Sequence, residues 1–225
     1  MIVEDNYFYQ NSADYGGAIN VSNSDGALIQ RNIIKDTRSY SALMISGTGS
    51  DPVTVRNNII DGVSVETAPG SGNWTDQNGI VIRHEPTSPH LIYHNTLVNT
   101  KSGIVGQFST KIVIANNIFA YLTGKSIDVT VDVDLTGSTH NLFYENEEDP
   151  FPLEDPIQHF DPLFVDVLNH DFHLTEDSMA IDAGVTLPVD DDLDGDARPK
   201  GAGYDIGADE WVPSSFEVFC PLICQ

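Results

Sequence analysis

The sequence predicts an all-β fold, a right-handed parallel β-helix with three sheets, followed by a small C-terminal module. An asparagine followed by two mostly apolar residues recurs six times, as NYF, NII, NII, NTL, NIF and NLF, beginning at positions 6, 32, 58, 95, 117 and 141. The intervals of 26, 26, 37, 22 and 24 residues lie in the range of solenoid repeats. Short β-rich runs separated by Gly, Asn, Asp and Ser fill the intervals, and no segment shows helical periodicity of comparable strength.

The repeat also predicts which side chains face the core. The residue two positions after each asparagine is always apolar, and so is the residue three positions before the first five. These two predicted columns are Phe8, Ile34, Ile60, Leu97, Phe119 and Phe143, and Val3, Ile29, Val55, Ile92 and Ile114. One coil cannot bury its inward face alone, so coils must stack to form a continuous core. The asparagine suits a corner of the coil, because it tolerates left-handed or bridging backbone angles and its amide can bond the backbone of the bend.

Composition limits the partners of the chain. Its 225 residues include 34 Asp and Glu against 10 Lys and Arg, which gives a net charge of -24. Such a field repels nucleic acid and anionic lipid headgroups, so neither is expected as a direct partner. The chain has no apolar run long enough for a membrane-spanning helix, and the residues after Met1 lack the basic and apolar regions of a signal peptide. We therefore expect neither feature in this chain.

Corner asparagines in successive coils can bond one another along the helix axis. In this respect the pattern resembles the asparagine ladder of pectate-lyase-like β-helices, over about residues 1–145. The resemblance implies a carbohydrate-active protein with a polysaccharide as its partner. It also implies that the substrate lies along the outer face of one sheet, beside the longest loops.

The repeat fades after residue 145, and we expect a cap module at 146–212 and an apolar tail at 213–225. The segments DFHLTEDSMAIDAG (171–184), DLDGDARPKG (192–201) and DIGADEW (205–211) resemble the choice-of-anchor Q module of secreted bacterial β-helix proteins. That resemblance implies an extracellular or cell-surface location in a bacterium and supplies no catalytic residue. The tail FEVFCPLICQ, with the chain's two cysteines, is similar to short endings of secreted bacterial proteins and suggests surface attachment through the C-terminus.

The outer face expected to carry the site is the one formed by runs such as GIVIRH at 79–84. Alternation of side chains predicts its inward residues as Ile19, Val21, Ile45, Ile80, Ile82, Ile104, Ile127 and Val129. Two outward columns follow, namely Asn20, Met44, Val81, Val105 and Asp128, and beside them Ser22, Ser46, Arg83, Gln107 and Thr130. A further column contains Glu85 and Asp132.

The longest interval in the repeat marks the most site-like stretch. Its excess length comes from the Gly- and Ser-rich loop 62–79, which ends directly before this strand and contains Trp74. An aromatic ring can stack on a sugar face, and Arg83 beside it can bind a carboxylate or hydroxyl. A solvated loop whose tryptophan packs against the coil is the alternative interpretation.

Two enzyme chemistries fit this region. A polysaccharide lyase removes the proton beside a uronate carboxylate, and Arg83, His84 and Lys101 are candidates for the base and for the cation that stabilises the developing charge. A glycoside hydrolase instead needs two carboxyl groups that flank the bond, and Glu85, Asp128 and Asp132 are the candidates. Adjacent coils are about 4.8 Å apart, so a carboxyl pair two coils apart would be about 10 Å apart, slightly too wide. The lyase is therefore favoured, with Trp74, Gln107 and Asp132 as candidate substrate-binding residues.

A non-catalytic protein is the other interpretation of the same residues. The scarcity of Lys and Arg favours a glycan-binding or adhesin-like surface module, because a uronate lyase needs several cations in its groove. The long loop beside IRHE favours the enzyme.

The clearest ion-binding pattern lies in the C-terminal module. Asp190, Asp192 and Asp194, followed by Gly195, match the first half of a calcium loop. Gly201 stands where an EF-hand has its glutamate, so another kind of Ca²⁺ loop or a solvated acidic turn remains. His90 and His94 could in principle share a metal, but no third ligand is evident, and bend-lining roles are favoured.

Overall fold

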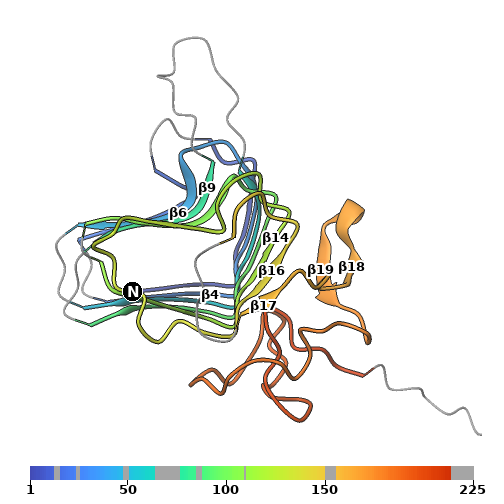
Figure 1. Ribbon diagram of the computed structural model, residues 1–225. Coiled ribbons are helices and arrows are strands. Elements are labelled where there is room, and N and C mark those ends of the chain that lie inside the picture. The colour runs from blue at the N-terminus through green and yellow to red at the C-terminus, as the bar shows by residue number, and fades with distance from the viewer. Residues whose placement is uncertain are drawn as a thin grey trace, which may run out of the picture.

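The computed structural model describes residues 1–12, 16–23, 26–47, 51–63, 77–84, 88–108, 110–149 and 156–213. Its body is a stack of coils whose strands form three parallel sheets (Figure 1). Sheet 1 consists of β1 (Ile2–Glu4), β4 (Ala27–Gln30), β7 (Val53–Arg56), β10 (His90–Tyr93) and β13 (Ile112–Ala115). Sheet 2 consists of β2 (Tyr7–Tyr9), β5 (Ile33–Thr37), β8 (Ile59–Val63), β11 (Thr96–Val98), β14 (Ile118–Ala120), β16 (Leu142–Tyr144) and β17 (Ile157–Gln158). Sheet 3 consists of β3 (Ile19–Ser22), β6 (Ser41–Gly47), β9 (Asn78–His84), β12 (Ser102–Gly106) and β15 (Ile127–Val129).

The predicted fold class and both predicted core columns are confirmed. In sheet 1, Val3 pairs with Ile29, and the register continues through Val55, Ile92 and Ile114. In sheet 2, the register joins Phe8, Ile34, Ile60, Leu97, Phe119 and Phe143. Phe119 and Phe143 stack with ring centroids 5.2 Å apart. Like side chains therefore stack on like side chains along the axis and fill one continuous core.

The six repeated asparagines form a ladder at the corner between sheets 1 and 2. The Nδ2 of Asn32 donates to Oδ1 of Asn58 at 2.9 Å, and the Nδ2 of Asn58 donates to Oδ1 of Asn95 at 2.9 Å. The same contact joins Asn6 to Asn32, Asn95 to Asn117, and Asn117 to Asn141. The Nδ2 of Asn58 also donates to two backbone carbonyls, one in its own coil and one in the preceding coil. The ladder thus satisfies the buried backbone of a corner that water does not reach.

Each coil turns this corner through a left-handed residue. These residues are Asp5, Arg31, Asn57, His94, Asn116 and His140, with φ between 50° and 58°. The expectation that the ladder asparagine itself takes this conformation is wrong by one position. The left-handed residue turns its own side chain out of the coil, and the asparagine that follows points inward to reach the next coil. A second left-handed position follows four residues after each ladder asparagine, at Gln10, Asp36, Gly62, Asn99, Tyr121 and Glu145.

The C-terminal module lies against the side of the helix, next to sheet 2. In Figure 1, which looks along the stack of coils, the orange and red part of the chain lies outside the coil cross-section. It contains an antiparallel pair, β18 (Phe164–Asp166) and β19 (Asp171–Leu174), joined by the 3₁₀ turn η1 (Val167–Asn169). Its apolar side chains pack on the outer face of sheet 2 in one cluster, which includes Ile59, Ile118, Leu142, Phe164, Phe172, Leu174, Leu193 and Ile206. We expected a cap, whereas the structure shows a module that covers a side wall.

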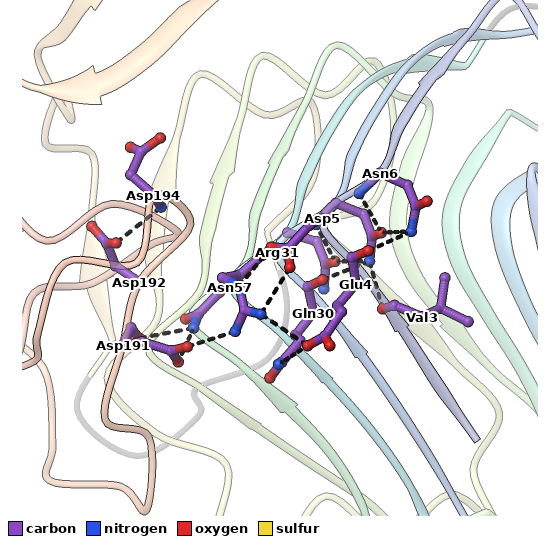
Figure 2. A network of polar contacts seen from close by, with 12 residues as sticks. Val3, Glu4, Asp5, Asn6, Gln30, Arg31, Asn57, Asp191, Asp192 and Asp194 are labelled. Carbon is purple, nitrogen blue, oxygen red and sulfur yellow. Dashed lines mark hydrogen bonds and ion pairs between the residues drawn. The ribbon is translucent and has the colours of Figure 1, made fainter.

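The left-handed corner residues also attach this module (Figure 2). The guanidinium of Arg31 contacts Asp191 at 2.6 Å, Asp5 at 2.7 Å and Glu4 at 2.8 Å. One coil further on, the Nδ2 of Asn57 donates to the Asp191 carbonyl at 2.8 Å. Two elements far apart in the sequence are thus held together by side chains that the corner sends outward.

The next two coils continue the attachment. His94 is fully buried, and its Nδ1 lies 3.1 Å from the Asp205 carbonyl oxygen. Asn116 donates to the Val185 carbonyl at 2.7 Å and accepts from the Val185 N–H at 2.9 Å. Burial lowers the pKa of His94 well below its ordinary value, so the imidazole is neutral at this interface.

A buried ion pair organises the interior of the module. Arg198 contacts Glu210 at 2.8 Å, and both side chains are fully buried. The same guanidinium donates to the carbonyls of Asp205 and Gly207, while Glu210 accepts from the N–H of Lys200. Because breaking such a pair leaves a buried charge uncompensated, Arg198 fixes the loops that surround it.

Sheet 2 continues past the expected end of the β-helix. The predicted helix region ended at residue 145, but β17 adds one more strand to sheet 2 after it. Residues 214–225, which make up nearly all of the predicted tail, lie outside the described residues. No helix in the part of the chain that the structure describes is long and apolar enough to cross a membrane.

The ladder gives a direct stability prediction. Replacing Asn58 with alanine removes the acceptor for two donors of Asn32 and the donor for three carbonyl oxygens. The variant should lose about 3 kcal/mol of unfolding free energy, measured by denaturant titration, because several buried polar groups lose their partners.

The control for this variant is Asn6→Ala at the exposed end of the same ladder. Asn6 gives up fewer contacts and water can replace them, so the loss should be about 1 kcal/mol or less. Equal losses for the two variants would contradict the role of the buried ladder.

Candidate functional site

The outer face of sheet 3 has the residue columns that the sequence predicts. Met44 pairs with Val81, and the register extends through Asn20, Val105 and Asp128. Ser22, Ser46 and Arg83 form the neighbouring column. The predicted inward residues Ile19, Val21, Ile45, Ile80, Ile82, Ile104 and Ile127 belong to the buried core, and Val129 packs against it. The alternation therefore places the candidate side chains on the outer face, as expected.

An open pocket lies at the edge of this face, at the corner where the chain passes from sheet 2 into sheet 3. Its volume is about 220 Å³. We call it the basic pocket; the residues that line it are Tyr40, Asn78, Lys101, Ser102, Val105, Gln107, Gly124, Lys125 and Asp128. Lys101, Gln107 and Asp128 were all predicted as site residues from the sequence. The structure therefore brings together three of the predicted residues from two neighbouring coils.

Arg83 is tied to one wall of the basic pocket through Tyr40. Its Nη2 donates to the Tyr40 Oη at 2.5 Å, and its guanidinium carbon lies 5.0 Å from the centroid of the ring. Tyr40 is buried and packs with Met44, Val81 and Val105 in a small apolar cluster on the outer face of sheet 3. This cluster gives the pocket an apolar floor beside its cations.

Lys125 is a member of the pocket that sequence reasoning missed. Its ammonium lies 3.3 Å from Asp128 and 3.9 Å from Glu148. The hydrogen bond to Asp128 is the main cause that raises the pKa of Lys125, so this side chain is a cation at neutral pH. A signal was available in the sequence, because the pair Lys-Ser occurs at 101–102 and again at 125–126, at equivalent corners of successive coils.

The remaining residues predicted for this face either do not line the pocket or lie outside the described residues. Trp74 and Glu85 lie outside the described residues, and the side chain of His84 does too, although its backbone belongs to β9. Asp132 is exposed and accepts a hydrogen bond from the Thr130 hydroxyl at 2.5 Å. It is not among the described residues that line the basic pocket.

Among the described residues, the three aspartates of the expected calcium loop do not form a group whose oxygens lie close enough to share an ion. Asp192 is fully buried and accepts hydrogen bonds from the backbone N–H groups of Asp194, Asp196 and Glu210, between 2.8 and 3.0 Å. Asp190 and Asp194 are exposed, and Asp194 points away from the Arg31 network (Figure 2). Because backbone donors already occupy both oxygens of Asp192, a calcium ion bound by all three carboxylates does not fit this arrangement.

Asp194 instead belongs to a cluster with His173. The imidazole Nε2 lies 2.8 Å from Asp194 and the Nδ1 lies 2.5 Å from Asp171. One ligand atom each from His173, Asp194 and Asp209 lie within 4.8 Å of one another. The hydrogen bond to Asp194 is the main cause that raises the pKa of His173 to about 10, so the charges of the cluster are paired internally. We assign it no metal.

His90 and His94 serve the scaffold, as the sequence favoured. The Nδ1 of His90 accepts from the N–H of Val53 in the preceding coil at 2.9 Å. His94 contacts the C-terminal module and Asn116. The two rings bind different partners and do not form a metal site.

The three stacked parallel sheets define the class of this protein as a parallel β-helix. Residues 1–119, just over half of the chain, match the family model for the right-handed β-helix region. The chain therefore belongs to the right-handed β-helix family. A search of curated proteins found no match. The family match ends before residue 160, so it lends no support to the choice-of-anchor Q resemblance, which stays a prediction.

The hydrogen bonds of Asp192 predict that calcium does not change the thermal stability of the protein. Thermal unfolding curves recorded with excess Ca²⁺ and with a chelator should coincide, because backbone amides already hold the loop at 190–196 in place. A clear rise of Tm in Ca²⁺, absent from the Asp194→Asn variant, would restore the calcium loop.

Buried carboxyl groups predict how stability depends on pH. Burial raises the pKa of Asp205 and of Asp209 to about 6, from an ordinary value of 3.8, so the folded state binds more protons between about pH 4 and 6. The pKa of His173 is about 10 against an ordinary 6.5, so its stabilising charge is fully present below pH 6.5 and is lost as pH rises toward 10. Both effects lower stability as pH rises, and together they outweigh buried His94, whose lowered pKa acts in the opposite direction below about pH 6.5. The Tm should therefore be higher at pH 5 than at pH 8.

The Asp209→Asn variant is the control for that profile. It keeps an oxygen acceptor for the Leu174 N–H but cannot ionise, so its Tm should fall less between pH 4 and 6 than that of the wild type. A wild-type Tm that rises steadily from pH 4 to 8 would contradict the assignment of the buried carboxyl groups.

Proposed function

We propose that this protein binds an acidic polysaccharide at the basic pocket and cleaves it by a lyase-type elimination. The observation that carries the proposal is the concentration of cations at one corner of a very acidic molecule. Three of the ten basic residues, Arg83, Lys101 and Lys125, lie in or beside this pocket. A surface with net charge -24 repels a polyanion unless a local cationic site receives it, and this pocket supplies such a site.

The lining suits a sugar that carries a carboxylate. Lys125 is a cation, and Arg83 presents a guanidinium next to the ring of Tyr40. The apolar floor and the ring can contact a sugar face, while Asn78, Ser102 and Gln107 provide groups that can bond hydroxyls. A pocket of about 220 Å³, open to solvent, leaves room for a chain that continues beyond it.

Elimination needs a base that removes a proton and a cation that stabilises the resulting negative charge. In the proposed step, the base takes the proton from the carbon beside the carboxylate, and the C–H electron pair becomes a carbon–carbon double bond. The neighbouring carbon–oxygen bond breaks, and the leaving oxygen takes a proton from solvent. Lys101, in its neutral amine form, is the proposed base, while Lys125 and Arg83 stabilise the negative charge that develops on the carboxylate. His84, Trp74 and Glu85 remain candidates from the sequence alone.

The alternative functions make different demands on the pocket. A hydrolase needs two carboxyl groups, but Asp128 is the one carboxylate among the described lining residues, and it is paired with Lys125. A non-catalytic glycan-binding module needs only the cations and the apolar floor, and the small number of cations favours it over a highly active lyase. An extracellular or surface location, with attachment through the C-terminus, is part of the proposal in either case.

Binding and cleavage can be measured separately. The protein is mixed with polygalacturonate and with alginate, and ultraviolet absorbance follows the unsaturated product while calorimetry follows binding. We expect both signals with at least one polymer. Binding without an unsaturated product or new reducing ends would establish the glycan-binding module. No binding to any polyuronate would refute the proposal.

Charge-removing variants test the pocket itself. Lys125→Met should weaken binding about tenfold or more, because one charge-assisted contact contributes about 1.5–3 kcal/mol. Lys101→Met should abolish elimination and weaken binding less. Lys111→Met, which removes an equal charge from an exposed residue at the start of sheet 1's strand β13, should leave both unchanged. An equal effect of all three variants would point to bulk charge and not to the pocket.

A further inference from the structure

A second pocket lies along the same corner, nearer the N-terminus. It has a volume of about 130 Å³ and opens to solvent. We call it the hydroxyl pocket; the residues that line it are Asn11, Ser12, Gly17, Ala18, Thr37 and Ser39. They belong to the first two coils, at the passage from sheet 2 to sheet 3. No sequence pattern had singled out this place.

Two polar atoms in this lining have no partner among the residues that the structure describes. These are the Nδ2 of Asn11 and the Oγ1 of Thr37, and both are buried. The whole Thr37 side chain is buried, with 0 % of its surface exposed. A buried polar group without a partner destabilises the folded state, so such groups are rare in native proteins unless a bound molecule completes them. Two of them in one pocket point to a ligand.

The chemistry of the lining defines that ligand. The amide of Asn11 offers donors, and the hydroxyl of Thr37 can donate or accept. Ser39 donates its own proton to the Ser41 carbonyl at 2.5 Å, which leaves its oxygen as an acceptor. None of the described lining side chains carries a charge. The matching group is an uncharged edge rich in hydroxyls, as on one side of a sugar ring.

The hydroxyl pocket lies on the same corner as the basic pocket, the proposed site of cleavage. Ser39 lines the hydroxyl pocket, and the next residue, Tyr40, lines the basic pocket. The remaining basic-pocket residues belong to coils three to five, so the two pockets are two to three coils apart along one corner. With coils about 4.8 Å apart, this corresponds to about 10–15 Å, the length of a few linked sugar rings.

We propose that the hydroxyl pocket is a second sugar subsite, which binds a ring of the same polysaccharide a few residues away from the ring held by the basic pocket. The inference rests on the proposed function for the identity of the polymer. Asn11, Thr37 and Ser39 bind hydroxyls there, while the cations of the basic pocket bind the carboxylate. A short oligomer fills the basic pocket alone, and a longer one fills both.

The test compares Thr37→Val with the wild type on short and long oligomers of the polyuronate that binds most tightly, by calorimetry. Valine has nearly the shape of threonine and removes only the unpartnered hydroxyl. The wild type should bind long oligomers at least tenfold more tightly than short ones. Thr37→Val should lose most of this gain and leave binding of short oligomers unchanged. Its Tm should equal or exceed that of the wild type, since no hydrogen bond within the protein is lost.

The controls separate the possible failures. Thr54→Val makes the same change on the outer face of sheet 1 and should alter neither affinity. Asn11→Ala should repeat the loss for long oligomers. If long oligomers bind Thr37→Val as tightly as the wild type, the pocket holds solvent only and the subsite is refuted. If no oligomer binds even the wild type, the proposed function itself is refuted, and the subsite with it.

Discussion

The structure depends on one repeated contact, the hydrogen bond from the side-chain amide of one corner asparagine to that of the next coil. Parallel strands from different coils pair correctly only if every coil turns at the same place. Asn58 shows how this is enforced. Its Nδ2 donates to Asn95 and to two backbone carbonyls, and its Oδ1 accepts from the backbone N–H of Asn32. Leaving these buried polar groups without partners would lower the free energy of unfolding. The ladder therefore fixes the register of the coils, and this register places the two core columns inward and the outward side chains on the outer faces of the sheets.

The same corner attaches the C-terminal module. A left-handed residue before each ladder asparagine sends its side chain outward, and in four consecutive coils that side chain contacts the module, through Arg31, Asn57, His94 and Asn116. At each of these backbone turns, the ladder asparagine points into the coil and the residue before it points outward to the module. The module therefore covers sheet 2 and leaves the corner between sheets 2 and 3 to the two pockets.

The asparagine spacing was sufficient to predict the three sheets, the columns from Phe8 to Phe143 and from Val3 to Ile114, and the outward placement of Arg83. It did not predict the left-handed position, although all six residues there are polar and five are Asp, Asn or His, the types enriched at such backbone angles. Asp192 shows a second limit. Its sequence context matches a calcium loop, yet its carboxylate accepts from Glu210, eighteen residues away, and only the folded module reveals that partner. Thr37 gave no signal at all, since a buried threonine looks ordinary until its neighbours are known.

The proposed function requires that a single corner, between sheets 2 and 3, receives an acidic polysaccharide. Chemical-shift mapping on this 24.6 kDa protein tests it most directly. On addition of a long uronate oligomer, the largest amide shifts should fall at residues 37–41, 101–107 and 124–128, while β4, β7 and β10 of sheet 1 stay unchanged. Shifts concentrated on sheet 1 or on the C-terminal module, or no shifts with any polyuronate, would contradict the claim.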